Sequence, residues 1–176
     1  KQKTAYEMQV ASERAIIQAL GVEKIEKIVF ASVYSKDEQV LMCAKIMHKI
    51  GYYEKAKQFL LSISESTMNP YVFFYLGNIS FQNCQYEVAI HYYEESLRFD
   101  QELAEVYNNL GCSYLALTKK NLAKECFAHA LKLRSNYQDA MFNIRAAIEK
   151  ESKAKFTERE LRKQLLDYQN DDVWGG

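Results

Sequence analysis

The sequence predicts an all-α protein, a right-handed α-solenoid of antiparallel helix pairs closed by a C-terminal capping helix. One observation is a repeat, because Leu76-Gly77 recurs as Leu110-Gly111 and Ala89 recurs as Ala123, each 34 residues later. Another is that apolar residues follow helical spacing through most of the chain. The third is the scarcity of chain breakers, with 6 Gly and the single Pro70 among 176 residues. Together these features indicate stacked helix pairs that share one continuous core.

Two complete repeat units are predicted, at residues 70–103 and 104–137. In the first, Asn69 followed by Pro70 is a favourable helix start, because the Asn side chain can accept from a free amide and Pro has no amide to satisfy. The four helices of these units are expected at about 71–83, 86–99, 104–117 and 121–133.

Less regular units are predicted on both sides of this centre. Thr157 and Glu160 have the spacing of a capping box, which predicts that the last helix begins near Glu158. The flanking parts, in order, are an N-terminal helix pair that is a degenerate repeat or a cap, 1–36; a weaker repeat, 37–69; a degenerate repeat with capping helices, 138–168; and a C-terminal tail, 169–176.

Charge and hydropathy argue against two classes of partner. Lys plus Arg and Asp plus Glu number 23 each, so the net charge is zero and no long-range attraction draws the chain to nucleic acid or to an anionic membrane. No stretch approaches the roughly 20 apolar residues of a membrane span, so direct membrane insertion is not expected. No signal-peptide pattern is present, and because residue 1 is Lys the chain is expected to be a fragment.

No residue pattern indicates catalysis, a metal or another cofactor. The three histidines are isolated on helices, and the chain has no glycine-rich phosphate loop, serine nucleophile elbow or HExxH motif, so it is predicted not to be an enzyme. The cysteines form no CxxC pair and are expected to be small buried thiols in a reducing compartment, which favours the cytoplasm. They are Cys43, Cys84, Cys112 and Cys126.

The repeated residues resemble the tetratricopeptide repeat (TPR) family. The match is strongest at 104–137 and weaker at 37–69, and it covers roughly residues 37–150. The matching residues of 104–137 are Tyr107, Leu110, Gly111, Tyr114, Ala123, Phe127 and Ala130. Those of 70–103 are Phe73, Leu76, Gly77, Ala89, Tyr93 and Ser96, with Ser80 in place of the expected Tyr. Near the end of each unit, where Pro is common in the family, the first unit has Gln101 and the second has Ser135. The resemblance implies a TPR-like superhelix that works by binding proteins.

The resemblance also implies which surface binds, because the first helix of each TPR pair lines a concave groove. Asn109 and Asn143 share the position that holds bound backbone in TPR receptors for peroxisomal targeting signals and in O-GlcNAc transferase. Asp139 and Asn143 stand where chaperone-binding repeats carry Lys and Arg, so a clamp for a peptide carboxylate is not expected. The implied peptide-binding groove consists of Lys45, Phe74, Tyr75, Asn78, Glu105, Asn108, Asn109, Asp139, Phe142 and Asn143.

Three functions remain open at this stage. The first is a module that binds a partner peptide in the groove, as part of a larger adaptor or assembly. The second is a structural scaffold subunit that packs through its ridges in a transport or ciliary type of complex. The third is an appendage of an enzyme whose catalytic domain lies outside this chain. Self-association is a further expectation, because the apolar pair Val173 and Trp174 in the tail could enter a groove.

Overall fold

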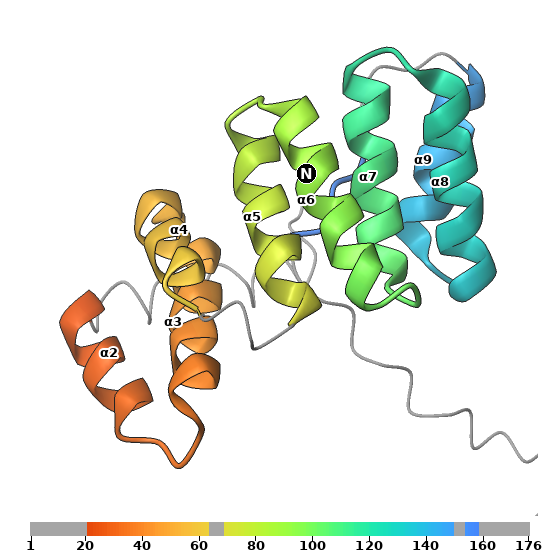
Figure 1. Cartoon of the computed structure of the whole chain (residues 1–176). Coiled ribbons are helices and arrows are strands. Elements are labelled where there is room, and N and C mark those ends of the chain that lie inside the picture. Colours follow the sequence, from red (N-terminus) through yellow and green to blue (C-terminus); the bar gives the residue numbers. More distant parts are fainter. Residues whose placement is uncertain (1–20, 64–68, 150–153, 159–176) are drawn as a thin grey trace, which may run out of the picture.

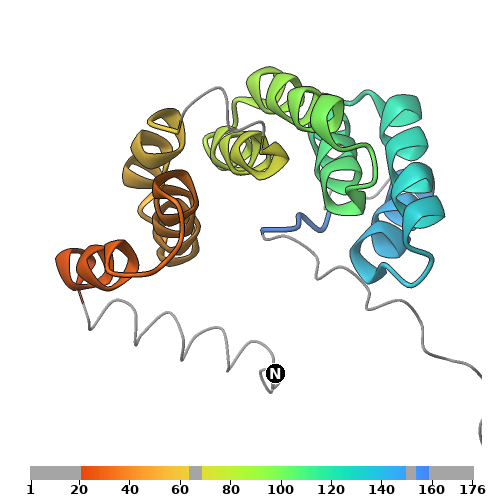
Figure 2. The ribbon, with the colours of Figure 1, turned by 60° about the horizontal axis from the view of Figure 1, so that its bottom comes forward.

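The computed structural model describes residues 21–63, 69–149 and 154–158, and within these ranges the chain forms α-helices and no β-strand. Figure 2 shows the helix pairs following one another around an arc. The described helices, coloured along the chain in Figure 1, are α2 (Val22–Phe30), α3 (Lys36–Ile50), α4 (Tyr53–Leu61), α5 (Pro70–Gln82), α6 (Tyr86–Phe99), α7 (Ala104–Ala116), α8 (Lys120–Leu133) and α9 (Gln138–Glu149). The predicted all-α fold of helix pairs is confirmed.

Local capping interactions explain where two of the helices begin. At the start of α5, the Asn69 side chain accepts from the amide of Tyr71 at 3.0 Å, and Pro70 occupies the first helical position, as the sequence predicts. At the start of α3, Ser35 and Glu38 form a reciprocal capping box that the sequence analysis did not anticipate. The Ser35 amide donates to Glu38 Oε2 at 2.9 Å, so α3 begins directly after Ser35.

In each of the two central helix pairs, the first helix carries a glycine at the point where an aromatic ring of the second helix crosses it. The two helices therefore pack closely. A Cβ added to Gly77 of α5 would lie 2.5 Å from the ring of Tyr93 in α6. A Cβ added to Gly111 of α7 would lie 2.6 Å from the ring of Phe127 in α8. Both rings are fully buried, so the repeated Gly is a packing requirement of the fold.

The turns inside the helix pairs also repeat, with a residue of positive φ at the same place each time. Gly51, Cys84 and Thr118 have φ values of 88°, 59° and 61° in the turns after α3, α5 and α7. The expectation that Cys84 is buried was therefore wrong, because this turn position is exposed. For Thr118 the conformation is costly, since a β-branched side chain crowds the backbone there.

Replacing Thr118 by Gly is expected to stabilise the protein by about 1 kcal/mol. Relief of the left-handed conformation gains about 1–2 kcal/mol, and the greater freedom of Gly in the unfolded chain returns part of this gain. Denaturant unfolding would measure the difference. Ala116→Gly, at an exposed helical residue two positions earlier, is the matched control and is expected to lower stability. A loss of stability in Thr118→Gly would contradict the proposed strain.

Several sequence expectations fall outside the described residues. These are the first helix of the N-terminal pair, the tail at 169–176 with its proposed self-association, and all but the first residue of the predicted capping helix. Glu158, where that helix was expected to begin, is not helical. None of the described helices combines the length and the apolar character that crossing a membrane requires.

Candidate functional site

Three asparagines form a row along the inner face of the superhelix, one from each of three successive first helices. They are Asn78 of α5, Asn109 of α7 and Asn143 of α9, and their side chains have no exposed surface. A buried amide that lacked hydrogen bonds would cost free energy, so the partners of these side chains decide what the row does. We call these three residues the asparagine row.

The row is occupied by a segment of the same chain, residues 154–158, which we call the docked segment. Figure 2 shows it on the inner side of the arc. Asn109 donates to the carbonyl of Thr157 at 2.7 Å and accepts from the amide of Thr157 at 2.9 Å. Asn143 does the same for Lys155, donating to its carbonyl at 2.7 Å and accepting from its amide at 2.5 Å. The two bound residues are two apart, and each directs both its amide and its carbonyl to the asparagine row, which is the alternation of an extended segment.

The third asparagine continues this arrangement with a single bond. Asn78 Nδ2 donates to the carbonyl of Glu158 at 3.2 Å. Its Oδ1 accepts from the Tyr93 hydroxyl at 2.9 Å and from Asn109 Nδ2 at 3.0 Å, which fixes the orientation of both amides. Complete burial raises the pKa of the Tyr93 hydroxyl well above its usual value, so it remains a donor at neutral pH.

Asn108 stands beside the row and joins its two bidentate members. It accepts from Asn143 Nδ2 at 2.8 Å through its own Oδ1. Its Nδ2 lies 3.1 Å from the carbonyl of Lys155 and 3.2 Å from Thr157 Oγ1. The network therefore satisfies the backbone of the docked segment at alternate residues, as a neighbouring β-strand would.

The side chains of the docked segment occupy three different surroundings. The Thr157 hydroxyl contacts the Tyr137 hydroxyl and donates to Asp139 Oδ2 at 3.3 Å. The Phe156 ring stacks on Phe81, with ring centroids 4.4 Å apart and planes inclined by 11°. The Lys155 ammonium lies 4.6 Å from the ring centroid of Phe142.

Most of the groove residues named from the sequence lie around this segment. Six of them contact it or each other there, and the structure brings together Asn78, Asn108, Asn109, Asp139, Phe142 and Asn143. Two lie further along the groove near Tyr71, whose hydroxyl donates to Glu105 at 3.3 Å and whose ring has the Lys45 ammonium 5.4 Å from its centroid.

Two predicted groove residues instead belong to the core. Phe74 has no exposed surface, and its ring packs between Tyr75 and Tyr93 at centroid distances of 5.2 and 6.4 Å. Tyr75 is also buried, with its ring edge-on to that of His48 at 5.3 Å. The TPR resemblance placed Phe74 and Tyr75 in the groove, but both side chains pack in the core, because α5 contacts α3, α4 and α6.

Three parts of the site were not predicted from the sequence. Tyr137 lies just before α9 and so outside the first helices, whereas Phe81 lies on the first helix α5, one residue before its end, and was not among the groove residues named. The docked segment itself was missed because Thr157 was interpreted as a helix cap. Its Oγ1 is instead engaged by Tyr137, Asp139 and Asn108, and the rest of the predicted capping box lies outside the described residues.

The cysteines of the groove and core are unreactive by environment. Burial raises the pKa of the Cys43 thiol to about 11 and that of Cys126 to about 12. Cys112 lies under the docked segment, with its Sγ 3.6 Å from the carbonyl of Lys155, and burial raises its pKa as well. Cys84 is the exposed thiol among the four.

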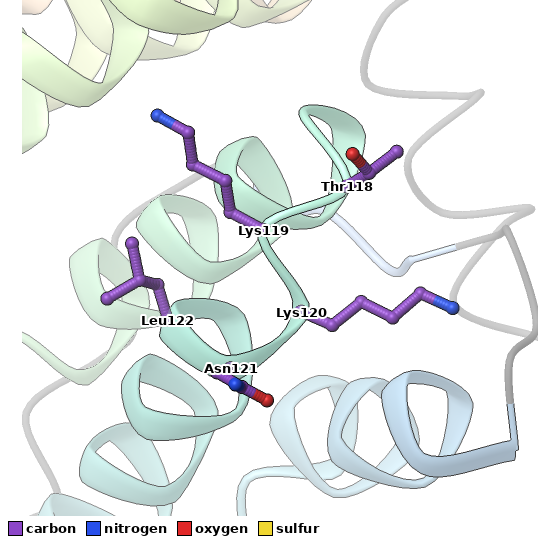
Figure 3. Close-up of a pocket in the computed structure, with 5 residues that line it drawn as sticks. All are labelled: Thr118, Lys119, Lys120, Asn121 and Leu122. Carbon is purple, nitrogen blue, oxygen red and sulfur yellow. The ribbon is translucent and has the colours of Figure 1, made fainter.

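No second site with convergent chemistry competes with this groove in the part of the chain that the structure describes. No cluster of three or more His, Cys, Asp or Glu there is arranged to hold a metal ion. A shallow hollow lies at the turn between α7 and α8, lined by residues 118–122. Figure 3 shows the side chains of Lys119 and Lys120 pointing apart, so they do not converge on a common ligand.

Comparison with known proteins identifies the repeats. Residues 70–103 and residues 104–137 each match a family model described as tetratricopeptide repeat. No curated protein sequence matches the chain significantly.

Solved structures match the fold over much of the chain. A crystal structure of MamA superposes with a TM-score of 0.65 at 17% identity, covering 86% of this chain and 86% of that one. The first TPR of Spaghetti (RPAP3), bound to the HSP90 peptide SRMEEVD, has a TM-score of 0.62 at 18% identity and covers 67% of this chain and 94% of that one. The Sgt2 TPR domain from Aspergillus fumigatus has a TM-score of 0.59 at 19% identity, with 66% and 80% covered.

Proposed function

The chain belongs to the tetratricopeptide repeat family, a protein-interaction fold, and we propose that it is a non-catalytic module that binds an extended segment of a partner protein in its concave groove. One observation carries this proposal. Asn109 and Asn143 each bond both the amide and the carbonyl of one residue in the docked segment. On the side of the docked segment these bonds involve only backbone atoms, so an extended segment of another protein can form the same bonds.

The burial of the asparagine row supports the same role. These amides have no exposed surface while the segment is docked, and the backbone of that segment supplies the hydrogen bonds that their burial requires. Groove residues also hold these amides: Tyr93 and Asn109 both donate to Asn78, and Asn143 donates to Asn108. Such contacts lower the ordering cost when a ligand binds. The groove therefore has the properties of a preorganised receptor for extended backbone.

The chemistry of the groove differs from what an acidic peptide such as SRMEEVD requires. Asp139 presents its carboxylate to the bound segment, 3.3 Å from the Thr157 hydroxyl. A carboxylate ligand placed there would be repelled, and the neighbouring groove residues are amides that carry no positive charge. The proposed ligand is therefore a neutral or basic extended segment.

A second function is favoured by one observation on the outer face. Val88 of α6 and Leu122 of α8 occupy equivalent repeat positions and remain 44% and 42% exposed. Apolar residues repeated on the outer helices would suit a scaffold that packs through its ridges. This is the alternative against which the groove has to be tested.

Affinity purification with matched variants separates the two functions. A partner captured by the wild-type chain should be lost with Asn109→Ala plus Asn143→Ala, and retained with Asn121→Ala, which removes an exposed asparagine outside the groove. It should also be retained with Val88→Ser plus Leu122→Ser. Loss of the partner in the ridge variant, with retention in the groove variant, would overturn the proposed function in favour of the scaffold. Circular dichroism on every variant confirms that the helices are intact.

A further inference from the structure

The docked segment shows which side chains the groove accepts, and this deepens the proposed function on which it rests. We infer that the groove selects an extended partner segment in which an aromatic residue is followed directly by threonine or serine. Residues 154–158 then act as the intramolecular competitor of that partner. The aromatic and the hydroxyl correspond to Phe156 and Thr157, and each has its own subsite.

The hydroxyl subsite is built from polar groups on two elements. Thr157 Oγ1 contacts the hydroxyl of Tyr137, lies 3.3 Å from Asp139 Oδ2 and lies 3.2 Å from Asn108 Nδ2. Thr157 is buried, with 6% of its surface exposed. A methyl group in place of this hydroxyl would remove one hydrogen-bond partner from each of these buried polar groups, so the subsite discriminates against valine.

The buried phenol beside this subsite remains protonated. Burial is the main cause that raises the pKa of Tyr137, with the nearby carboxylates acting in the same direction. The group facing the ligand is therefore a neutral hydroxyl next to the carboxylate of Asp139. A phosphate on the ligand threonine would bring a charge of about −1.5 to −2 against Asp139, so the subsite takes the unmodified hydroxyl.

The aromatic subsite lies on the opposite side of the extended backbone. Phe156 stacks on Phe81 at a centroid distance of 4.4 Å, which is close to parallel contact. Phe81 in turn meets the ring of Tyr86 edge-on at 5.3 Å, so the platform is held from behind. The neighbouring positions contribute less, because the side chains of Lys155 and Glu158 are exposed.

The docked segment and a partner cannot occupy the groove together. Asn109 has one carbonyl and one amide group, and both are used by Thr157 and the neighbouring Asn78. The same holds for Asn143, whose two groups are used by Lys155 and Asn108. A partner therefore binds by exchange with the docked segment. Cys112, buried below the Lys155 carbonyl, reports whether the groove is covered.

A peptide titration tests this inference on the full chain. The probe is a fluorescein-labelled peptide with the sequence of residues 151–161, and the host is the chain with Phe156→Ala plus Thr157→Val, which weakens its own segment. We expect this host to bind the peptide at least about tenfold more tightly than the wild-type chain, by fluorescence anisotropy. Peptides with Thr→Val, Phe→Ala or phosphothreonine should each bind about tenfold or more weakly than the parent.

Thiol labelling gives a second readout of the same exchange. Cys112 should react slowly in the wild-type chain and in the Asn121→Ala control, which changes an exposed residue outside the groove, faster in the host variant, and slowly again when the parent peptide is added. The exposed Cys84 is the internal reference for the reagent. If the host variant does not fold, the ranking of the four peptides on the wild-type chain tests the same selectivity.

The outcomes separate the inference from the proposed function. If all four peptides bind equally well and Asn109→Ala abolishes their binding, the groove reads backbone alone; the inference is then overturned and the proposed function stands. If no peptide binds and labelling of Cys112 is unaffected by any of them, the proposed function is overturned as well. Preference for the parent peptide with protection of Cys112 supports both.

Discussion

Replacing Gly111 by Leu is expected to destabilise the protein by about 3 kcal/mol. A Cβ at this position would already lie 2.6 Å from the ring of Phe127, and a leucine adds three more carbons in the same direction. The contact lies between α7 and α8, which are the two helices of one repeat, so the whole pair must separate to accept it. A thermal melt should show a decrease in Tm of roughly 6–12 °C for a domain of this size.

Matched variants show whether the close helix contact is the cause. Ala123→Leu, at a fully buried residue of α8, should be similarly harmful, whereas Ala128→Leu, at an exposed residue of the same helix, should change stability by less than about 0.5 kcal/mol. Gly111→Ala combined with Phe127→Leu should lose less stability than the two single changes added together. Melts of Gly111→Leu that match the wild type would refute the packing described for the repeats.

Replacing Asn109 by Ala is expected to release the docked segment while the helices remain folded. The substitution removes both bonds to Thr157 and leaves its buried amide and carbonyl unsatisfied, at a cost of about 1–3 kcal/mol per group. Hydrogen exchange at the Thr157 amide should therefore accelerate by at least about 30-fold, which corresponds to the lower limit of about 2 kcal/mol for the two groups. The amides of α5 and α6 should keep their exchange rates, and Asn121→Ala should leave the Thr157 amide unchanged. Unaltered exchange at Thr157 in Asn109→Ala would show that this asparagine does not hold the segment.

The repeat fold was predictable because its signals are local and occur twice. Gly77 and Gly111 are 34 residues apart in the sequence, and in the structure each leaves room for an aromatic ring of the neighbouring helix. The start of α5 was equally readable, because Asn69 and Pro70 are adjacent. The pattern did not show which residues of α5 face the core and which face the groove. Seven consecutive residues of α5 from Phe74 are buried, so helical spacing alone could not distinguish core from groove.

The candidate site was predictable from one side only. The resemblance to the TPR family implied that Asn109 and Asn143 bind backbone, because both stand at a repeat position that does so in other TPR proteins. Their occupant was not identified, because Thr157 meets Asn109 across 48 residues and no local pattern marks such a contact. Thr157 also has the spacing of a helix cap with Glu160, and this local pattern predicted a helix start because the distant partners of Thr157 cannot be seen in the sequence. Phe81 and Tyr137 were missed for a related reason, because they contact Phe156 and Thr157 of the docked segment, which no local pattern indicates.

The short connection between α9 and the docked segment sets a threshold for any competing ligand. Only residues 150–153 separate the last residue of α9 from Ala154, so the segment samples the groove at an effective concentration of millimolar order. A free ligand at micromolar concentration must therefore bind about a thousandfold more tightly than the segment does intrinsically to displace half of it. Affinities measured with a chain that ends before Ala154 would exceed those of the longer chain by about the ratio of this effective concentration to the intrinsic dissociation constant of the segment.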